Sequence, residues 1–309
     1  MERSFSTLTR LELCQKKFTQ KPHLIAELAS FALSSGNIKL GRGKLSLQLS
    51  SENEEVILRI SSIIAKLYGV RSEILAYEKT QPKKHTVYSI EVSPTDEAGK
   101  LLFDIGLLTG TSEDYSFSSV NKALFEPEGC FEAALRGAFL GCGVLCDPIK
   151  AYRLEFVFNE EEFAKLLQEK MLEAGIQAHM LERKERYVVY VKQIESISDV
   201  LILSGASGVM MQIESVRVEK DVINNLNRSG NCIVSNINKA VVASQKQIED
   251  INKLMLNKVK LSSSLKEACE LRINNPDLSL NELSGISGIS KTALNKRFIK
   301  IRELAQELE

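Results

Sequence analysis

Apolar and polar residues follow one pattern twice along the first two thirds of the chain. Residues 28–36 (LASFALSSG) and 135–143 (LRGAFLGCG) match at a fixed offset, with leucines and a closing glycine in equivalent places. The same offset aligns two stretches, 44–49 and 152–157, in which apolar and polar residues alternate as in a half-buried β-strand. The repeated pattern predicts two copies of one structural unit.

Each copy continues with a helical pattern. Apolar residues spaced three and four apart predict a helix over residues 53–68 in the first copy and over residues 160–174 in the second. Gly69 and Gly175 follow these helices, where a left-handed residue often closes the last turn. The two helices therefore have predicted C-terminal ends as well as predicted buried faces.

A further strand follows each of these helices. Alternating apolar residues predict strands over residues 87–92 and 187–191. Each copy then contains a helix, two strands, a helix and one more strand, with a helical tail. The expected fold class is α+β, with a αββαβ domain duplicated as two pseudo-symmetric halves, residues 1–118 and 119–216.

The repeated helices carry small residues at matching positions. Ser30 and Ser34 in the first copy, and Gly137 and Gly141 in the second, are pairs four residues apart, so each pair lies on one helix face. Small side chains on such a face allow two helix backbones to approach closely. We expect the two halves to meet along these helices, although small pairs at this spacing also arise by coincidence.

The pattern changes near Val216. Residues 224–238 contain six asparagines, a residue type that is common in turns and helix caps. An amphipathic stripe follows, which predicts a helix in a linker, residues 217–260, that packs one face on a domain. The stripe consists of Ile237, Val241, Ser244, Ile248, Ile251 and Met255.

The last segment, residues 261–309, predicts three short helices. The first helix stops before Pro276, because proline cannot continue it. Ser279 and Glu282 form a capping box that starts the second helix at Leu280. The predicted inner face of this second helix contains Leu283 and Ile286.

A tight turn separates the second helix from the third. Gly285 and Gly288 suit that turn, and Ser290 caps the helix that follows, residues 291–302. Three short helices with a tight turn between the last two are typical of a helix-turn-helix domain. The predicted buried stripe of the third helix is Leu294, Phe298 and Ile301.

The third helix is basic and contains no acid over residues 291–302. A recognition helix has short polar side chains near its start, which meet base edges, and cations that meet phosphates. Such binding weakens as salt rises, because phosphate contacts release counterions. A solvated basic helix within a helical bundle is the alternative interpretation. The candidate DNA-binding residues are Ser290, Lys291, Thr292, Asn295, Lys296, Arg297, Lys300 and Arg302.

Charge divides the chain although the whole is neutral. Residues 217–309 contain 15 lysines and arginines against 11 acids, a balance of +4, and residues 1–216 contain 25 against 29, a balance of −4. A basic C-terminal third favours a polyanionic partner. The partner that we expect is double-stranded DNA.

The composition predicts neither a metal site nor a membrane segment. The six cysteines include no Cys-x-x-Cys pair, and the three histidines are scattered. We therefore expect reduced cysteines in a cytoplasmic protein, with no cofactor. The N-terminus lacks the apolar run of a signal peptide, and no stretch approaches the ~20 apolar residues of a membrane helix.

With both parts in place, the chain resembles the WhiA family of Gram-positive bacterial regulators over nearly its whole length. The resemblance is carried by an ordered set of segments rather than by one short motif. These segments are Ser4-Phe5-Ser6, residues 135–141, Asp147-Pro148, residues 152–155, Asn227-Arg228, Asn231-Cys232, Asn236, Lys239 and residues 290–297.

The resemblance implies a LAGLIDADG homing-endonuclease-like domain joined to a C-terminal helix-turn-helix domain. It also implies a DNA-binding regulator of transcription in sporulation, of cell division and of chromosome segregation. Such a protein would be associated with the nucleoid, and another regulatory protein is an alternative partner.

The resemblance further implies a loss of catalysis. Active LAGLIDADG nucleases carry an acid before the last glycine of each motif, and the two acids hold divalent metals against the scissile phosphates. Ser35 and Cys142 stand at these positions, and neither suits a hard cation. Leu33 and Leu140 occupy the other aspartate position of the motif. We expect no catalytic residue and no metal.

Two other functions remain open from the sequence. An interaction module would bind a protein or a small effector on the sheet. This hypothesis is distinguished from the DNA-binding one by which fragment, 1–216 or 220–309, restores function in cells. A divergent metal-dependent DNA endonuclease would nick plasmid DNA with magnesium or manganese, in a manner that depends on Ser35 or Cys142.

Overall fold

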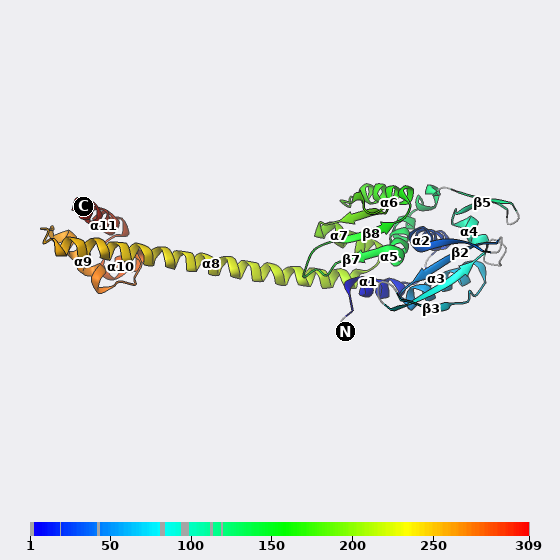
Figure 1. Ribbon diagram of the computed structural model, residues 1–309, viewed down its shortest axis with the longest axis horizontal. Coiled ribbons are helices and arrows are strands. Elements are labelled where there is room, and N and C mark those ends of the chain that lie inside the picture. Colours follow the sequence, from blue (N-terminus) through cyan, green and yellow to red (C-terminus); the bar gives the residue numbers. More distant parts are fainter. Residues whose placement is uncertain are drawn as a thin grey trace. The chain divides into compact units, whose positions relative to one another are not determined.

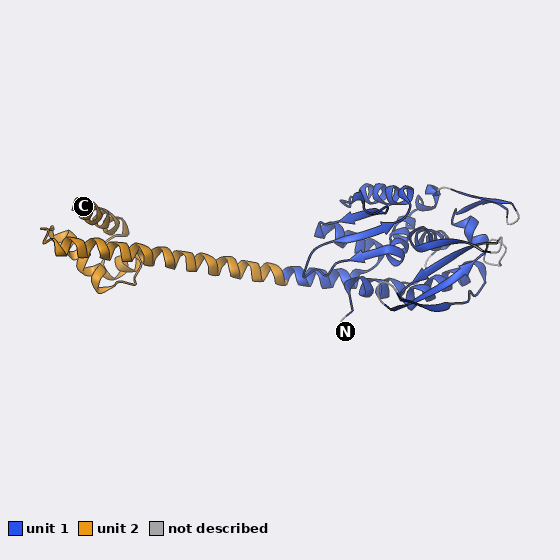
Figure 2. Cartoon of the chain, in the orientation of Figure 1, with its two compact units in different colours: residues 1–218 blue, residues 219–309 orange. Residues whose placement is uncertain are grey.

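The chain forms two compact units, which Figure 2 shows in different colours. The computed structural model describes residues 3–18, 20–41, 44–80, 84–93, 99–111, 114–118 and 120–308. Contacts group Met1–Val218 into unit 1 and Glu219–Glu309 into unit 2. Unit 1 contains both copies of the repeat, and unit 2 contains the C-terminal helices.

The first half of unit 1 is a four-stranded antiparallel sheet with its helices (Figure 1). The strand order is β1-β2-β4-β3. The predicted helix of this half ends at Gly69, whose φ of 75° closes it in the left-handed region. The elements are α1 (Phe5–Cys14), α2 (Lys21–Ser35), β1 (Gly36–Gly41), β2 (Lys44–Ser51), α3 (Glu54–Tyr68), β3 (Leu75–Lys79), β4 (His85–Val92) and α4 (Lys100–Asp104).

The second half repeats this plan. Its strand order, β7-β8-β10-β9, matches that of the first sheet position by position. The predicted duplication and the α+β class are therefore confirmed. A small hairpin of β5 (Leu108–Gly110) and β6 (Tyr115–Phe117) and the short helix η1 (Lys122–Phe125) precede this half. Its elements are α5 (Cys130–Cys142), β7 (Gly143–Leu145), β8 (Leu154–Phe158), α6 (Glu161–Glu173), β9 (His179–Glu182), β10 (Tyr187–Val191) and α7 (Ile194–Ser204).

The predicted αββαβ order omitted one strand in each half. The observed order is αββαββ, and the omitted strands are β3 and β9, each at the edge of its sheet. Most side chains of β3 are exposed, and those of β9 are exposed or half-buried. Neither strand therefore has the alternating apolar pattern by which sequence reveals a half-buried strand.

Helices α2 and α5 pack against each other through the middle of unit 1 (Figure 1). Phe31 of α2 and Phe139 of α5 are fully buried in one core that includes residues of both sheets. The Phe139 ring meets the edge of Phe156 from β8, with ring centroids 6.2 Å apart. The two halves therefore share a single hydrophobic core.

Unit 2 is helical and has its own core. Helix α8 (Ser207–Leu256) starts in unit 1 and continues into unit 2 without interruption. It is followed by α9 (Ser263–Asn274), α10 (Leu280–Ser287) and α11 (Lys291–Gln306). The core of unit 2 contains Ile251, Leu254, Ala268, Cys269, Leu283, Leu294, Phe298, Ile301 and Ala305.

Three expectations for this part of the chain were wrong. The asparagine-rich residues 224–238 are helical, so the alternative in which these asparagines form turns and caps is wrong. Only part of the predicted α8 stripe is covered, because Ile237 and Met255 are 56% and 61% exposed. Ile286 of α10 is also exposed, whereas Leu283 of that short helix is buried in the core and Leu280 packs against it.

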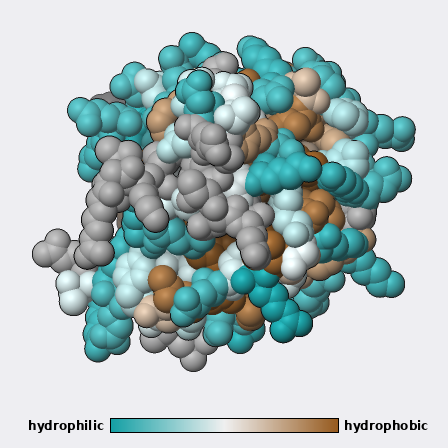
Figure 3. Space-filling view, turned by 90° about the vertical axis from the view of Figure 1, so that its right-hand side faces the viewer, coloured by the Kyte–Doolittle hydropathy of each residue, from teal (hydrophilic) through white to brown (hydrophobic). Residues whose placement is uncertain are grey.

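The surface of unit 1 in Figure 3 is mostly hydrophilic, with separate hydrophobic patches. The largest exposed apolar side chains of unit 1 include Ile38 and Phe117. Over the residues that the structure describes, no helix has the length and apolar character needed to cross a membrane.

Candidate functional site

Four small residues let α2 and α5 touch along their backbones. A Cβ atom on Gly137 would lie 2.1 Å from the carbonyl oxygen of Glu27, and one on Gly141 would lie 2.7 Å from Cβ of Ser34. Ser30 Oγ donates a hydrogen bond to the carbonyl oxygen of Ala134 across the contact, at 2.7 Å. The structure thus brings Ser30, Ser34, Gly137 and Gly141 to one helix–helix interface.

A buried carboxylate joins the two halves beside this interface. Glu27 of α2 is fully buried and accepts hydrogen bonds from Arg59 Nε at 2.5 Å and from Arg136 Nε at 2.9 Å. Arg59 comes from α3 and Arg136 from α5, so one charge fixes helices of both halves. The sequence repeat does not reveal this contact, because Arg136 aligns with Ala29 and so has no charged counterpart in the first copy.

The two motif helices end at Ser35 and Cys142. Ser35 Oγ donates to the carbonyl oxygen of Phe31, one turn back, at 3.1 Å. Burial raises the pKa of the Cys142 thiol to about 12, so this group is neutral at physiological pH. A neutral thiol and a hydroxyl are poor ligands for magnesium. Within the described residues, no group of three or more His, Cys, Asp or Glu side chains could hold a metal.

A groove of about 1080 Å³ opens over these helix ends and collects residues from both halves. Its acidic lining residue, Glu52, lies 3.4 Å from His85 Nε2. Within the described part of the chain, none of the lysines and arginines that line the groove pairs with a carboxylate. These unpaired cations are Arg10, Lys79, Arg183, Lys184 and Arg186.

Arg10 reaches the groove from α1, outside the repeat. Its Nη2 donates to the carbonyl oxygen of Gly143 at 2.6 Å, and its guanidinium carbon lies 5.8 Å from the Phe139 ring centroid. Burial lowers the pKa of Arg10, because the guanidinium loses part of its hydration. A fixed cation therefore stands beside the end of the second motif helix, and no sequence pattern predicted it.

The other cations come mainly from the turn between β9 and β10. Lys184 and Glu185 form a two-residue hairpin loop with φ of 52° and 58°. Arg183 N donates to the oxygen of Arg186 at 2.8 Å, which closes the loop. The sequence feature that could have predicted this cluster is the run of four charged residues, 183–186, just before a predicted strand.

The helix-turn-helix of unit 2 has well-defined ends. Ser279 Oγ accepts from Glu282 N at 3.3 Å, and the Glu282 carboxylate accepts from Ser279 N at 2.7 Å, which is the predicted capping box. Gly288 ends α10 with φ of 70°, and Ser290 Oγ accepts from Ala293 N at the start of α11. These caps fix where α11 begins relative to α10.

The predicted DNA-binding residues lie mostly on the exposed side of α11. Leu294, Phe298 and Ile301 are buried in the core and orient the helix. Ser290 is exposed but its hydroxyl is engaged as the cap. The exposed candidates on the helix itself are Lys291, Thr292, Asn295, Lys296, Lys300 and Arg302.

Among the residues that the structure describes, two of the eight candidates have acidic partners. Arg297 is half-buried, and its Nη1 lies 2.7 Å from a carboxylate oxygen of Glu267 on α9. Lys300 Nζ lies 3.0 Å from Glu303 in the same helix. Sequence reasoning also missed Arg272, which is 1% exposed and donates to Leu278 O at 2.6 Å. Arg272 thus holds the domain together from within, and Arg297 links α11 to α9 near the surface.

Three family models match successive parts of the chain. The model of the WhiA N-terminal LAGLIDADG-like domain matches residues 22–108, and that of the WhiA LAGLIDADG-like domain matches residues 131–223. The model of the WhiA C-terminal HTH domain matches residues 226–305. The matches follow the order of the two halves and the helix-turn-helix.

Known proteins resemble the chain over its full length. A protein of Clostridium botulinum (strain Hall) named probable cell division protein WhiA is 32% identical over 312 residues, which span 99% of each chain. A protein of the same name from Thermoanaerobacter sp. (strain X514) is 35% identical over 99% of this chain and 98% of its own. The crystal structure of full-length WhiA from Thermotoga maritima has the same fold, with a TM-score of 0.60 at 21% identity over 99% of each chain.

Proposed function

Since this chain belongs to the WhiA family, we propose that it is a DNA-binding regulator of cell division and chromosome segregation, of the kind that controls transcription in sporulation. It binds double-stranded DNA through the helix-turn-helix of unit 2. The observation that carries the proposal is the exposed polar and basic face of α11, on a helix fixed by a cap and a buried stripe.

The two ends of this face have different roles. Thr292 and Asn295 lie near the N-terminal end of α11, where a recognition helix meets base edges in the major groove. Lys291, Lys296 and Arg302 bind backbone phosphates, which supply affinity without sequence preference. Arg297 contributes by holding α11 to α9 through Glu267 rather than by meeting DNA.

A matched pair of double variants tests the assignment. Lys291→Ala/Lys296→Ala removes two charges from α11, and Lys260→Ala/Lys266→Ala removes two exposed charges elsewhere in unit 2. Affinity for a short DNA duplex is measured at several salt concentrations. The α11 variant binds more weakly, with a salt slope smaller by about two, because each lost phosphate contact lowers it by roughly one. Equal weakening by the second pair would contradict the assignment.

Unit 1 does not cleave DNA. Its motif helices end in Ser35 and Cys142, and neither supplies the carboxylate that a hard metal requires. Supercoiled plasmid therefore stays intact with magnesium or manganese. Nicking that Ser35→Ala or Cys142→Ala abolishes would establish the nuclease alternative instead.

A second site of DNA contact is the groove of unit 1. Its five unpaired cations favour the binding of a polyanion over that of a neutral effector or of a protein surface without acidic residues. Arg183→Ala/Arg186→Ala therefore weakens DNA binding by the full chain. The matched control is Arg71→Ala/Lys100→Ala, which removes two exposed charges outside the groove lining. Equal affinity of the two variants would leave the groove to a protein partner.

A further inference from the structure

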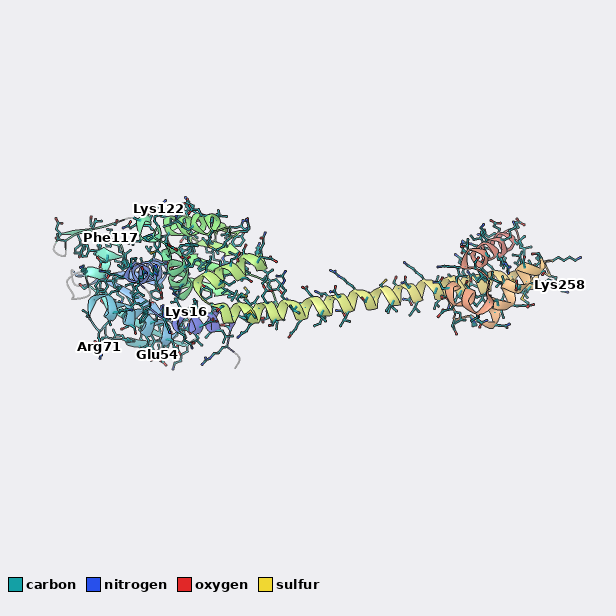
Figure 4. The ribbon with its side chains drawn as sticks, turned by 180° about the vertical axis from the view of Figure 1, so that it is seen from behind. Lys16, Glu54, Arg71, Phe117, Lys122 and Lys258 are labelled. Atoms are coloured by element: carbon teal, nitrogen blue, oxygen red, sulfur yellow. The ribbon has the colours of Figure 1, made fainter. Side chains whose placement is uncertain are left out.

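The middle of α8 exposes a row of apolar and small residues, here called the seam. Its members recur alternately three and four positions apart, so they lie on one face of the helix. Leu226, Ile233 and Ile237 are 66%, 59% and 56% exposed. Figure 4 shows side chains projecting from this stretch of the helix. The seam consists of Ile223, Leu226, Gly230, Ile233, Ile237 and Ala240.

The seam continues directly into the core of unit 2. The next positions with the same spacing are Ser244, Gln247, Ile251 and Leu254. Ile251 and Leu254 are 0% and 1% exposed, and Ser244 Oγ donates to the carbonyl oxygen of Pro276. One face of α8 is therefore a packing surface near its C-terminus, and the same face is uncovered over the seam.

The sequence of this stretch does not support a helix by itself. Residues 222–242 contain seven valines and isoleucines, six asparagines and one glycine, all of which have weak helix propensity. Its charged residues are Arg228 and Lys239, so ion pairs along the helix add little. Helices of this kind depend on packing of an apolar face. A partner on the seam would supply that packing.

We propose that the seam packs against the same seam of a second copy of this chain. Alternating spacings of three and four are those of a two-helix coiled coil, and Gly230 and Ala240 make room for larger side chains of the facing helix. A surface that pairs with itself must avoid like charges, and the positions beside the seam are all uncharged. They are Val222, Asn227, Ser229, Val234, Asn236 and Val241.

The mass of the full chain in solution tests the dimer, independently of any DNA binding. Ile233→Asp/Ile237→Asp places charges on the seam, and Val242→Asp is the matched control, because Val242 is 62% exposed on the opposite face of α8. Sedimentation equilibrium should give a dimer for the wild type and the control, and a monomer for the seam variant. A monomeric wild type, or a dimer that survives the seam variant, would overturn the proposal.

The aspartate substitutions could abolish the dimer simply by unfolding α8. Cross-linking tests the dimer with a milder substitution that introduces no charge. Ile233→Cys in a Cys232→Ser background places one thiol near the centre of the seam, where two copies of the chain meet in either orientation. The native Cys232, one residue away, is exposed on the other face and serves as the control. Mild oxidation should link the Ile233→Cys chain into a dimer and leave the wild type unlinked. Equal linking of both chains would contradict the seam.

Discussion

Single glycines control how closely the two motif helices approach. A methyl group on Gly137 would lie 2.1 Å from a backbone oxygen of α2, so Gly137→Ala forces the helices apart. We expect a loss of roughly 1–3 kcal/mol in the free energy of unfolding, as in overpacked cores. Gly285→Ala in α10 is the control, because nothing lies within 4 Å of its Cβ position. It should stabilise by up to about 1 kcal/mol, since alanine favours a helix. Urea denaturation measures both.

The cysteines differ in reactivity because their environments differ. Burial raises the pKa of Cys142 to about 12, so its reactive thiolate accumulates only as the pH approaches that value. Cys232 is exposed on α8. At pH 8, a thiol reagent should therefore modify Cys232 first and leave Cys142 unmodified in the folded chain. The Cys232→Ser variant should lose the fast phase of labelling, and rapid modification of Cys142 would contradict the raised pKa of its thiol.

Some residues of the candidate site could be predicted from sequence and others could not. The small residues of α2 and α5 could be predicted, because they recur at equivalent positions of a repeat. Arg10 was not, since α1 lies outside the repeat and reaches the groove only through the tertiary fold. Arg272 was not predictable either, because nothing in the sequence separates it from a surface arginine, and only the structure shows that its side chain is buried.

At the scale of elements, the start of α10 depends on its capping box. Ser279→Ala removes the hydroxyl that accepts from Glu282 N, and we expect unit 2 to lose about 1 kcal/mol of stability. Ser263→Ala at the start of α9 is the control, because it is exposed and its hydroxyl makes no hydrogen bond within the described residues. Thermal unfolding followed by circular dichroism measures the difference.

The same cap gives unit 2 a dependence on pH. Hydrogen bonds from the Ser279 hydroxyl and backbone N–H hold the pKa of Glu282 below its usual value of 4.5. The carboxylate therefore stabilises the fold above about pH 4.5, and this contribution is lost as the pH falls through the lowered pKa of the folded state. The acid-induced loss should be smaller in Glu282→Gln than in the wild type.

Elements with a strong apolar period were predictable, and those without one were not. Helices α3 and α6 were predicted to within a residue or two, because each buries one face on a sheet. The edge strands β3 and β9 have few buried side chains, so the apolar pattern did not predict them. The asparagine-rich part of α8 was not predicted as a helix, because its residue types have weak helix propensity when no packing partner is considered.

At the scale of the whole molecule, the two units have separate cores. Within the described residues, the core of unit 1 and that of unit 2 share no member. We therefore expect two unfolding transitions in calorimetry. Leu135→Ala should lower the first transition through a loss of about 2–5 kcal/mol in the stability of unit 1, and Phe298→Ala should lower the second through a loss of about 3–5 kcal/mol in unit 2. A single transition that both variants lower equally would show that the units unfold together.

The duplication of unit 1 was predictable at this scale, because both copies preserve the same order of patterns. The groove was not, since it gathers side chains from α1, from both sheets and from the β9–β10 turn. No sequence spacing records that convergence. The helix-turn-helix was predictable for the opposite reason, because its caps, turn and buried stripe all lie within a short segment.

The shared contact of α2 and α5 also sets an order of events during synthesis. The ribosome releases Lys21–Ser35 about a hundred residues before Cys130–Cys142. At typical elongation rates, the nascent first half waits roughly 5–20 s with its helix contact face uncovered and Glu27 short of one arginine. A fragment that stops before residue 130 would keep this face of α2 uncovered, and we expect chaperones and proteases to act on it.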